Sequence, residues 1–247
     1  MRHTKEIERP NEYATTIDWN ANAPYKIKML SANKDHIVVI DPAVRTPELD
    51  CFNHLALTSP LPLSYHLPAL HGMATLETEG VGAKGVIVLG SSSSVLENRD
   101  WQVSLGRWLK QRSGVPMLGI CFGHQLFAHL YGGVVDFMYT DNRKLSGFRE
   151  VTFTASRVWP AQKGRLTVTH REAVLGCPPE MEVIASSPEV AIEGLAHKTL
   201  PIWTLQAHPE ATPAFLRNMH IPAPERGDAL DFGWSLIRSF LQYCAKA

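Results

Sequence analysis

Short apolar runs in the first half of the chain alternate with a helical pattern. The runs are His36 to Asp41, Lys84 to Leu89 and Val115 to Ile120. Each run is continuous, which is typical of a strand that is buried on both faces of a parallel sheet. Between the second and the third run, residues 101–111 place apolar side chains at helical spacing and are followed by a glycine. The alternation of strand and helix predicts an α/β domain.

The pattern changes in the second half of the chain. From residue 147 to residue 206, short runs alternate apolar and polar residues between prolines and glycines, namely REVTFTA, RLTVTH, MEVIAS and PIWTLQ. Such alternation predicts strands that are in part antiparallel. A closing helix is predicted over about residues 229–243, with its inner face formed by Leu230, Trp234, Ile237 and Leu241. The expected fold is a three-layer α/β domain with some antiparallel strands.

Two segments carry no sustained pattern. Residues 1–34 are polar, and we interpret them as an N-terminal extension of a single domain that spans residues 35–247. Residues 42–72 contain five prolines between the first two apolar runs. We expect an irregular connection there, with one short helix.

Charge and hydrophobicity argue against some classes of binding partner. Lys plus Arg and Asp plus Glu both number 24, so there is no net basic field to attract nucleic acid or anionic lipid. No stretch reaches the roughly 20 apolar residues that span a bilayer. The N-terminus is polar and has no apolar leader segment, so the expected location is cytoplasmic. A small molecule or a protein is therefore the expected partner.

One of four widely spaced cysteines lies where a predicted strand meets a predicted helix. The four form no CxxC pair, which argues against a zinc ribbon and a dense disulfide framework. Cys121 is the centre of GICFG (residues 119–123), the cysteine counterpart of a nucleophile elbow, in which flanking glycines relieve crowding. The positive end of the helix dipole would favour its thiolate. A buried core cysteine is the alternative interpretation.

A cysteine nucleophile needs a base that takes the thiol proton and a third group that orients this base. The segment PIWTLQAHPE supplies both, because His208 follows a predicted strand and Glu210 lies two residues further on. Alone, His-Pro-Glu is also compatible with a surface turn or with the start of a helix. In combination with the elbow, it predicts a catalytic triad.

The order GICFGHQ, followed far downstream by HPE, resembles the class I (triad) glutamine amidotransferases, from about Lys84 to Glu210. The resemblance implies a flavodoxin-like sheet and a stand-alone glutaminase-like domain that needs no cofactor. The implied reaction is hydrolysis of the glutamine side-chain amide to glutamate and ammonia through a γ-glutamyl thioester. The chain has no nucleotide-binding loop and no room for a synthetase domain, so a separate ammonia-accepting synthase is the expected partner.

The resemblance also assigns roles to single residues. Cys121 would be the nucleophile, His208 the general base and acid, and Glu210 the orienting carboxylate. Gln125, one turn after the nucleophile, would help to hold the amino-acid end of the substrate.

A histidine on the substrate side is implied less directly. The stretch VTHREAVLG resembles the family's S-H-x-D segment and places His170 beside the substrate, but Arg171 and Glu172 follow it, which departs from the pattern. A surface histidine at a strand end is the alternative.

The loop before the elbow departs further from the family. Members usually carry S-G-G-P-x-S-V, whereas residues 89–95 here read LGSSSSV. We expect Gly90 on the substrate side and the backbone N–H groups of Ser91 and Phe122 in the oxyanion hole, since such donors do not depend on the side chain. Non-glycine residues resist a positive φ, so we expect the serine loop to flip between competent and incompetent states.

Alternatives to a glutaminase remain. A γ-glutamyl hydrolase or peptidase would use the same triad and release another amine. A catalytically silent binding or regulatory module would keep the fold but would usually lose a triad member. Cys121-x-x-His124 has metal-like spacing, but no second pair lies nearby, so no metal site is expected.

Overall fold

The computed structural model describes residues 35–224 and 228–247. They belong to one compact unit, Asp35–Ala247. The predicted N-terminal extension, residues 1–34, lies outside the described residues.

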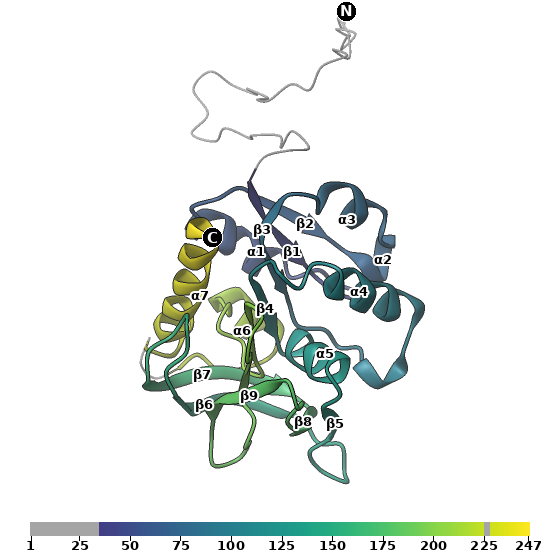
Figure 1. The fold of residues 1–247 in the computed structure, drawn as a ribbon. Helices are drawn as coiled ribbons and strands as arrows, with labels where there is room; N and C mark the ends of the chain where they lie inside the picture. Colours follow the sequence, from purple (N-terminus) through teal and green to yellow (C-terminus); the bar gives the residue numbers. More distant parts are fainter. Residues whose placement is uncertain (1–34, 225–227) are drawn as a thin grey trace, which may run out of the picture. The chain divides into compact units, whose positions relative to one another are not determined.

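A nine-stranded mixed sheet forms the centre of this unit (Figure 1). In order across the sheet, the strands are β2 (Leu63–His66), β1 (His36–Ile40), β3 (Ala83–Val88), β4 (Met117–Ile120), β11 (Ile202–Leu205), β10 (Gly194–His197), β9 (Met181–Ser186), β6 (Leu145–Phe153) and β7 (Gln162–His170). The first five are parallel to one another, and each later pair is antiparallel. The predicted change from parallel to antiparallel strands is therefore confirmed.

Helices cover both faces of the parallel half. The two faces can be followed along β1: Ile37 and Val39 belong to one core cluster, and Val38 and Ile40 belong to another. The first cluster includes side chains of α1 (Leu49–Thr58) and α7 (Asp228–Lys246). The second includes side chains of α3 (Ala74–Glu79), α4 (Asp100–Lys110) and α5 (Phe122–Leu130). This confirms the three-layer α/β fold.

The other elements of the unit are short. They are α2 (Pro68–His71), the 3-10 turn η1 (Val95–Glu97), α6 (Pro213–Asn218) and a two-stranded antiparallel sheet of β5 (Val134–Phe137) and β8 (Glu172–Gly176).

The prediction of an irregular connection over residues 42–72 was wrong. This segment contains the ten-residue helix α1, the parallel strand β2 and the short helix α2. Pro62 directly precedes β2, and Pro68 begins α2. Because β2 is an edge strand that pairs only with β1, prolines can flank it without breaking a ladder on a second side.

The run PIWTLQ has a more central place than its alternating pattern suggests. It forms β11, which is parallel to β4 on one side and antiparallel to β10 on the other. It therefore joins the two halves of the sheet.

Because the first five strands are parallel, their carboxyl ends lie on the same side of the sheet. In α/β folds of this kind, ligands bind outside the carboxyl ends of the strands. Within the described ranges, no helix combines the length and the apolar character that a membrane crossing requires.

Candidate active site

Cys121 occupies a strained position between a strand and a helix. It follows the last residue of β4 and precedes the first residue of α5, with φ of 50° and ψ of −98°. Positive φ is costly for a residue with a side chain, and such residues cluster at functional sites. The two flanking glycines let α5 approach the sheet: a β-carbon on Gly119 would lie 2.7 Å from the backbone of Gly123, and one on Gly123 would collide with the carbonyl oxygen of Val88. The elbow geometry predicted from GICFG is present.

Two backbone hydrogen bonds bring distant parts of the chain to this elbow. The N–H of Cys121 donates to the carbonyl oxygen of Leu205 at the end of β11, at 2.8 Å. Three residues further on, the N–H of His208 donates to the carbonyl oxygen of Thr167 on β7, at 2.7 Å. The segment that follows β11 is thereby held beside the nucleophile.

Within this segment, His208 and Glu210 form a buried pair. Nδ1 of His208 lies 2.9 Å from Oε1 of Glu210, and the two side chains are only 5% and 3% exposed. Because a carboxylate accepts, Nδ1 carries a proton. Nε2 has no formed hydrogen bond among the described residues and is left to the thiol of Cys121.

The charges around His208 favour its protonated form. Burial alone lowers the pKa of His208, but the negative charges of Glu210 and of a Cys121 thiolate outweigh burial, so that the pKa lies well above its ordinary value. This arrangement supports a thiolate–imidazolium pair.

Two further acids lie near this pair and were missed in the sequence. Asp41, fully buried after β1, accepts hydrogen bonds from the hydroxyl of Tyr65 and from the N–H groups of Ala43 and Glu48. Burial, together with the charges of Glu210 and Asp41, raises the pKa of Glu48 to about 7. His208 therefore lies near an acid, Glu48, whose own charge changes near neutral pH.

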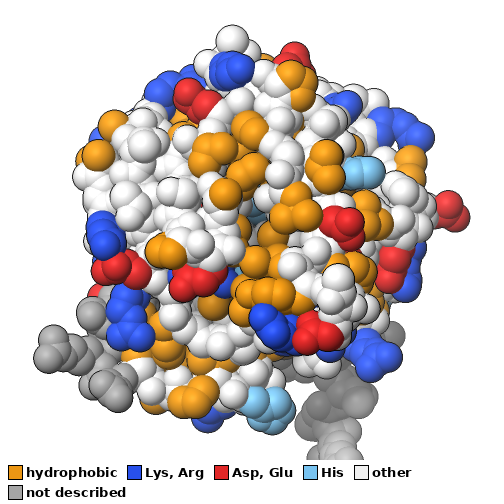
Figure 2. All heavy atoms as spheres, turned by 90° about the horizontal axis from the view of Figure 1, so that it is seen from below, with side chains coloured by type: hydrophobic (Ala, Val, Ile, Leu, Met, Phe, Trp, Pro, Cys, Tyr) orange, Lys and Arg blue, Asp and Glu red, His pale blue; other side chains and the backbone are white. Residues whose placement is uncertain are grey.

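A cavity of about 740 Å³ opens over Cys121. Its lining includes seven of the eight predicted site residues: Gly90, Ser91, Cys121, Gln125, His170, His208 and Glu210. Phe122 is instead fully buried as the first residue of α5, so its N–H has no acceptor within the helix. Figure 2 shows the molecule from below the view of Figure 1: hydrophobic side chains gather near the middle of this face, with charged side chains of both signs among and around them.

Gly90 lies against the side chains of His208 and Cys121. A β-carbon on Gly90 would lie 2.8 Å from Cε1 of His208 and 3.6 Å from Cβ of Cys121. The position therefore has room only for glycine.

The serine loop is held by its own side chains. The hydroxyl of Ser91 donates to the carbonyl oxygen of Pro42 at 2.7 Å and accepts from the N–H of Ser93 at 3.1 Å. The hydroxyl of Ser93 donates to the carboxylate of Glu97 at 2.6 Å. None of the four serines has a positive φ. The predicted flip of this loop stays a prediction.

Gln206 contacts Cys121 and was not predicted as a site residue from the sequence. Its side chain is fully buried, and its Nε2 donates to Sγ of Cys121 at 3.7 Å. Its Oε1 accepts from Nε2 of Gln125 at 3.2 Å. The position of Gln206 at the end of an apolar strand, two residues before His208, was the signal that could have revealed it.

The other two histidines considered are also buried. His170, at the end of β7, is only 4% exposed and lines the cavity, so it is not a surface histidine. His124 is fully buried in α5 and contacts the hydroxyl of Thr204 through Nδ1, at 2.7 Å. Across the described part of the chain, no three His, Cys, Asp or Glu side chains are grouped as a metal site would require.

A family model and several curated proteins match this chain. Residues 67–220, more than half of the chain, match the model of the family described as glutamine amidotransferase class-I. A GMP synthase [glutamine-hydrolyzing] of Cupriavidus taiwanensis is 32% identical over 140 residues, which cover 52% of this chain and 25% of the relative. A GMP synthase of Burkholderia mallei is 33% identical over 137 residues, with the same coverage. The chain spans about a quarter of the length of these curated relatives.

Solved structures share the fold at low identity. A glutamine amidotransferase from Thermotoga maritima has a TM-score of 0.65 and 17% identity, and the match covers 86% of this chain and 98% of that one. A glutamine amidotransferase from Methylobacillus flagellatus has a TM-score of 0.61 and 17% identity, with coverage of 87% and 94%.

Proposed function

Because the chain belongs to the class I glutamine amidotransferase family, we propose that it hydrolyses the side-chain amide of glutamine through a γ-glutamyl thioester on Cys121. The thiolate of Cys121 attacks the amide carbon. His208 then donates a proton to the leaving nitrogen as the carbon–nitrogen bond breaks, and ammonia departs. In the second half, His208 takes a proton from water, which attacks the thioester. The carbon–sulfur bond then breaks, which releases glutamate and restores the Cys121 thiolate beside the protonated His208.

One observation carries the proposal: a buried imidazole lies between the carboxylate of Glu210 and the thiol of Cys121. Glu210 fixes the tautomer of His208 and leaves Nε2 free for proton transfer at the nucleophile. Proton transfer of this kind requires such a base within reach of the thiol.

The oxyanion of the tetrahedral intermediate needs backbone donors. The N–H of Phe122, which begins α5, and the N–H of Ser91 are the proposed pair. The helix dipole of α5 adds a positive field at the same point.

We assign the ammonia to an acceptor synthase. The GMP synthases that the chain resembles are described as glutamine-hydrolyzing, and the chain matches only a quarter of their length. The family model that matches this chain is that of the class I glutamine amidotransferases, so we propose that a synthase outside the matched region uses the ammonia that the chain releases.

The size of the cavity supports a second candidate. A volume of about 740 Å³ lies within the range of about 300–1,000 Å³ that is typical of pockets for drug-sized ligands, and it exceeds what one amino acid needs. A γ-glutamyl hydrolase that releases a larger amine would use this additional space.

The test is a comparison of substrates on matched variants. Wild type, Cys121→Ala and Cys177→Ala are incubated with L-glutamine and with a γ-glutamyl dipeptide, and ammonia, glutamate and free amine are measured. Cys177 is exposed and does not line the cavity, so it controls for the loss of a cysteine. Glutamine turnover that is lost only in Cys121→Ala supports the glutaminase. Turnover of the dipeptide alone would move the proposal to the γ-glutamyl hydrolase, and turnover that persists in Cys121→Ala would refute both.

A further inference from the structure

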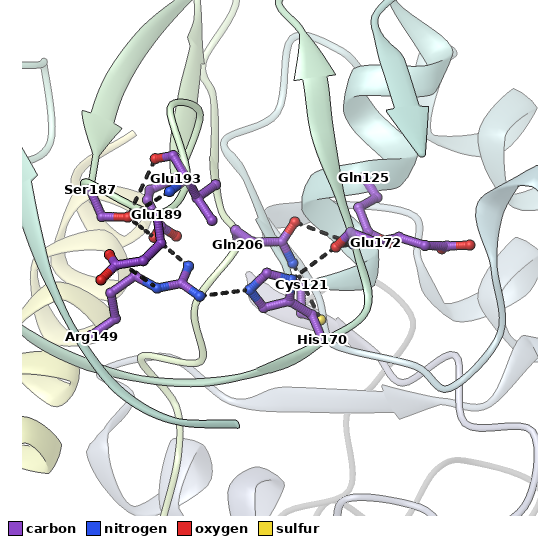
Figure 3. A network of polar contacts seen from close by, with 10 residues as sticks. Cys121, Gln125, Arg149, His170, Glu172, Ser187, Glu189, Glu193 and Gln206 are labelled. Atoms are coloured by element: carbon purple, nitrogen blue, oxygen red, sulfur yellow. Dashed lines mark hydrogen bonds and ion pairs between the residues drawn. The ribbon is translucent and has the colours of Figure 1, made fainter. Parts of the chain in front are cut away.

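A continuous series of polar contacts runs behind the cavity wall from β6 to the nucleophile (Figure 3). It begins at Arg149 and Glu193 and ends at Sγ of Cys121. Neither Arg149 nor Glu193 lines the cavity. The series is therefore a support for groups that meet the substrate.

Arg149 and Glu193 form a buried ion pair at the start of this series. NH1 of Arg149 lies 2.6 Å from Oε1 of Glu193, and the side chains are 6% and 0% exposed. The hydroxyl of Ser187 donates to the same oxygen at 2.8 Å. A buried pair of this kind is weak evidence for stability, because desolvation offsets much of the attraction. Stability alone therefore does not explain why this ion pair is buried at this position.

The second arm of the guanidinium reaches His170. NH2 of Arg149 lies 3.4 Å from Nε2 of His170, and Nδ1 of His170 lies 2.9 Å from the carbonyl oxygen of Glu172. A guanidinium can only donate and a carbonyl can only accept. The proton of the neutral ring is therefore on Nδ1, and the lone pair of Nε2 faces Arg149.

The same carbonyl links His170 to the residues around the thiol. Nε2 of Gln125 donates to the carbonyl oxygen of Glu172 at 2.8 Å and also to Oε1 of Gln206. Gln206 in turn donates to the sulfur of Cys121. A shift of His170 would therefore disturb Gln125, the other residue on the substrate side.

We infer that Arg149 is a positioning residue, which is anchored on Glu193 and holds His170 as a neutral, fixed ring on the substrate side of the cavity. The statement that His170 lies on the substrate side of the cavity rests on the proposed function. Both ring nitrogens of His170 have partners within the protein, so the carbon atoms of the ring line the cavity and limit its shape. The ring takes no part in proton transfer.

The charges that face His170 come from several elements. They are Arg149 on β6, Lys144 just before β6, and His208 after β11, while the ring of His124 on α5 also interacts with it. Burial lowers the pKa of His170 to about 4, and Arg149 is the next largest cause in the same direction. The hydrogen bond to the carbonyl of Glu172 opposes both.

The fork geometry of arginine makes this inference testable. Arg149→Lys keeps a positive charge for Glu193, but a single ammonium cannot reproduce the two arms of a guanidinium. The double variant Arg149→Met with Glu193→Gln removes both charges together, so that no buried charge is left unpaired. Glu150→Gln is the matched control, because Glu150 is the next residue on β6 and is exposed.

Two readouts are taken on the whole chain. Ring-nitrogen NMR of histidine-labelled protein follows His170 between about pH 5 and pH 8. We expect a neutral ring with its proton on Nδ1 in wild type, a shifted Nε2 signal in both Arg149 variants, and uptake of a proton at higher pH in the double variant. The KM for glutamine should rise about tenfold in both, with kcat within about threefold, since one charge-assisted hydrogen bond is lost.

The two readouts separate this inference from the proposed function. Unchanged His170 signals in both Arg149 variants would overturn it, whatever the activity. A KM within twofold of wild type would overturn the part that concerns the substrate. If wild type hydrolyses no glutamine, the proposed function fails, and the NMR signals still decide whether Arg149 positions His170.

Discussion

Gly90 lies against the catalytic base proposed here: a β-carbon on Gly90 would be 2.8 Å from Cε1 of His208. Gly90→Ala should therefore displace the imidazole from Cys121 and lower kcat/KM at least about 100-fold, because a base that is misplaced by about 1 Å loses that much. Steady-state hydrolysis, with a thermal melt to confirm folding, measures this.

Gly114→Ala is the matched control for this substitution. No atom lies within 4 Å of a β-carbon built on Gly114, and its φ is not positive. The control should keep wild-type kcat/KM. Equal activity of the Gly90 and Gly114 variants would mean that His208 does not need its present position.

Glu210→Gln should separate the effect of the hydrogen bond to His208 from the effect of the negative charge of Glu210. The amide can still meet Nδ1 of His208, but the attraction that raises the pKa of His208 is lost and burial then lowers it. We expect kcat to fall about 10³- to 10⁴-fold, as when the carboxylate of a comparable triad is neutralised. The pH profile of kcat is the measurement, with the exposed Glu150→Gln as control. A loss below about tenfold would contradict the orienting role of Glu210.

The proposed triad was accessible from the sequence because its signals are local. A strand, a G-x-C-x-G turn and a helix follow one another within residues 115–132, and His208 and Glu210 lie in one short segment. The resemblance that these residues indicated is confirmed by the match to the class I family. Glycines at 119 and 123 are required by contacts that the motif itself implies.

The contacts that hold the site residues in place could not be predicted from the sequence in this way. Arg149 meets Glu193 and His170 only because β6, the end of β7 and the residue before β10 come together, and no local sequence pattern predicts these contacts. Strand β2 was missed for another reason, since the prolines around an edge strand resemble those of a loop. Both the contacts of Arg149 and the formation of β2 depend on pairing between segments that are far apart in the sequence.

Glu48 should add an inflection to the pH profile of kcat/KM. Its pKa is raised to about 7, first by burial and then by Glu210 and Asp41. As the pH rises through 7, the new negative charge attracts the imidazolium of His208, so kcat/KM should rise. Glu48→Gln should lack this inflection, and Asp50→Asn, an exposed neighbour, should keep it. The same inflection in the Glu48 variant would exclude this acid as its source.

His124 should make the fold sensitive to acid. Burial lowers the pKa of His124 to about 3, below its ordinary value of 6.5, so the unfolded chain takes up a proton first as the pH falls. Its contribution to stability is complete above about pH 6.5 and decreases towards pH 3, by up to about 1.4 kcal/mol per pH unit.

Urea unfolding of His124→Asn at pH 7 and pH 5 tests this. The asparagine can keep a hydrogen bond to Thr204, and the loss of unfolding free energy between the two pH values should be about 2 kcal/mol smaller than in wild type. His71→Asn, at an exposed position, should behave as wild type. Equal losses in wild type and His124→Asn would show that His124 is not the acid-sensitive group.

The proposed hydrolysis passes through a γ-glutamyl thioester on Cys121, and this intermediate can be trapped. Wild type and Cys121→Ala are mixed with glutamine that is labelled in its carbon chain, quenched in acid and freed of unbound label. We expect label on wild-type protein that neutral hydroxylamine releases as the γ-glutamyl hydroxamate, and none on Cys121→Ala. Ammonia release without any labelled protein, or label that persists in Cys121→Ala, would rule out a thioester on Cys121.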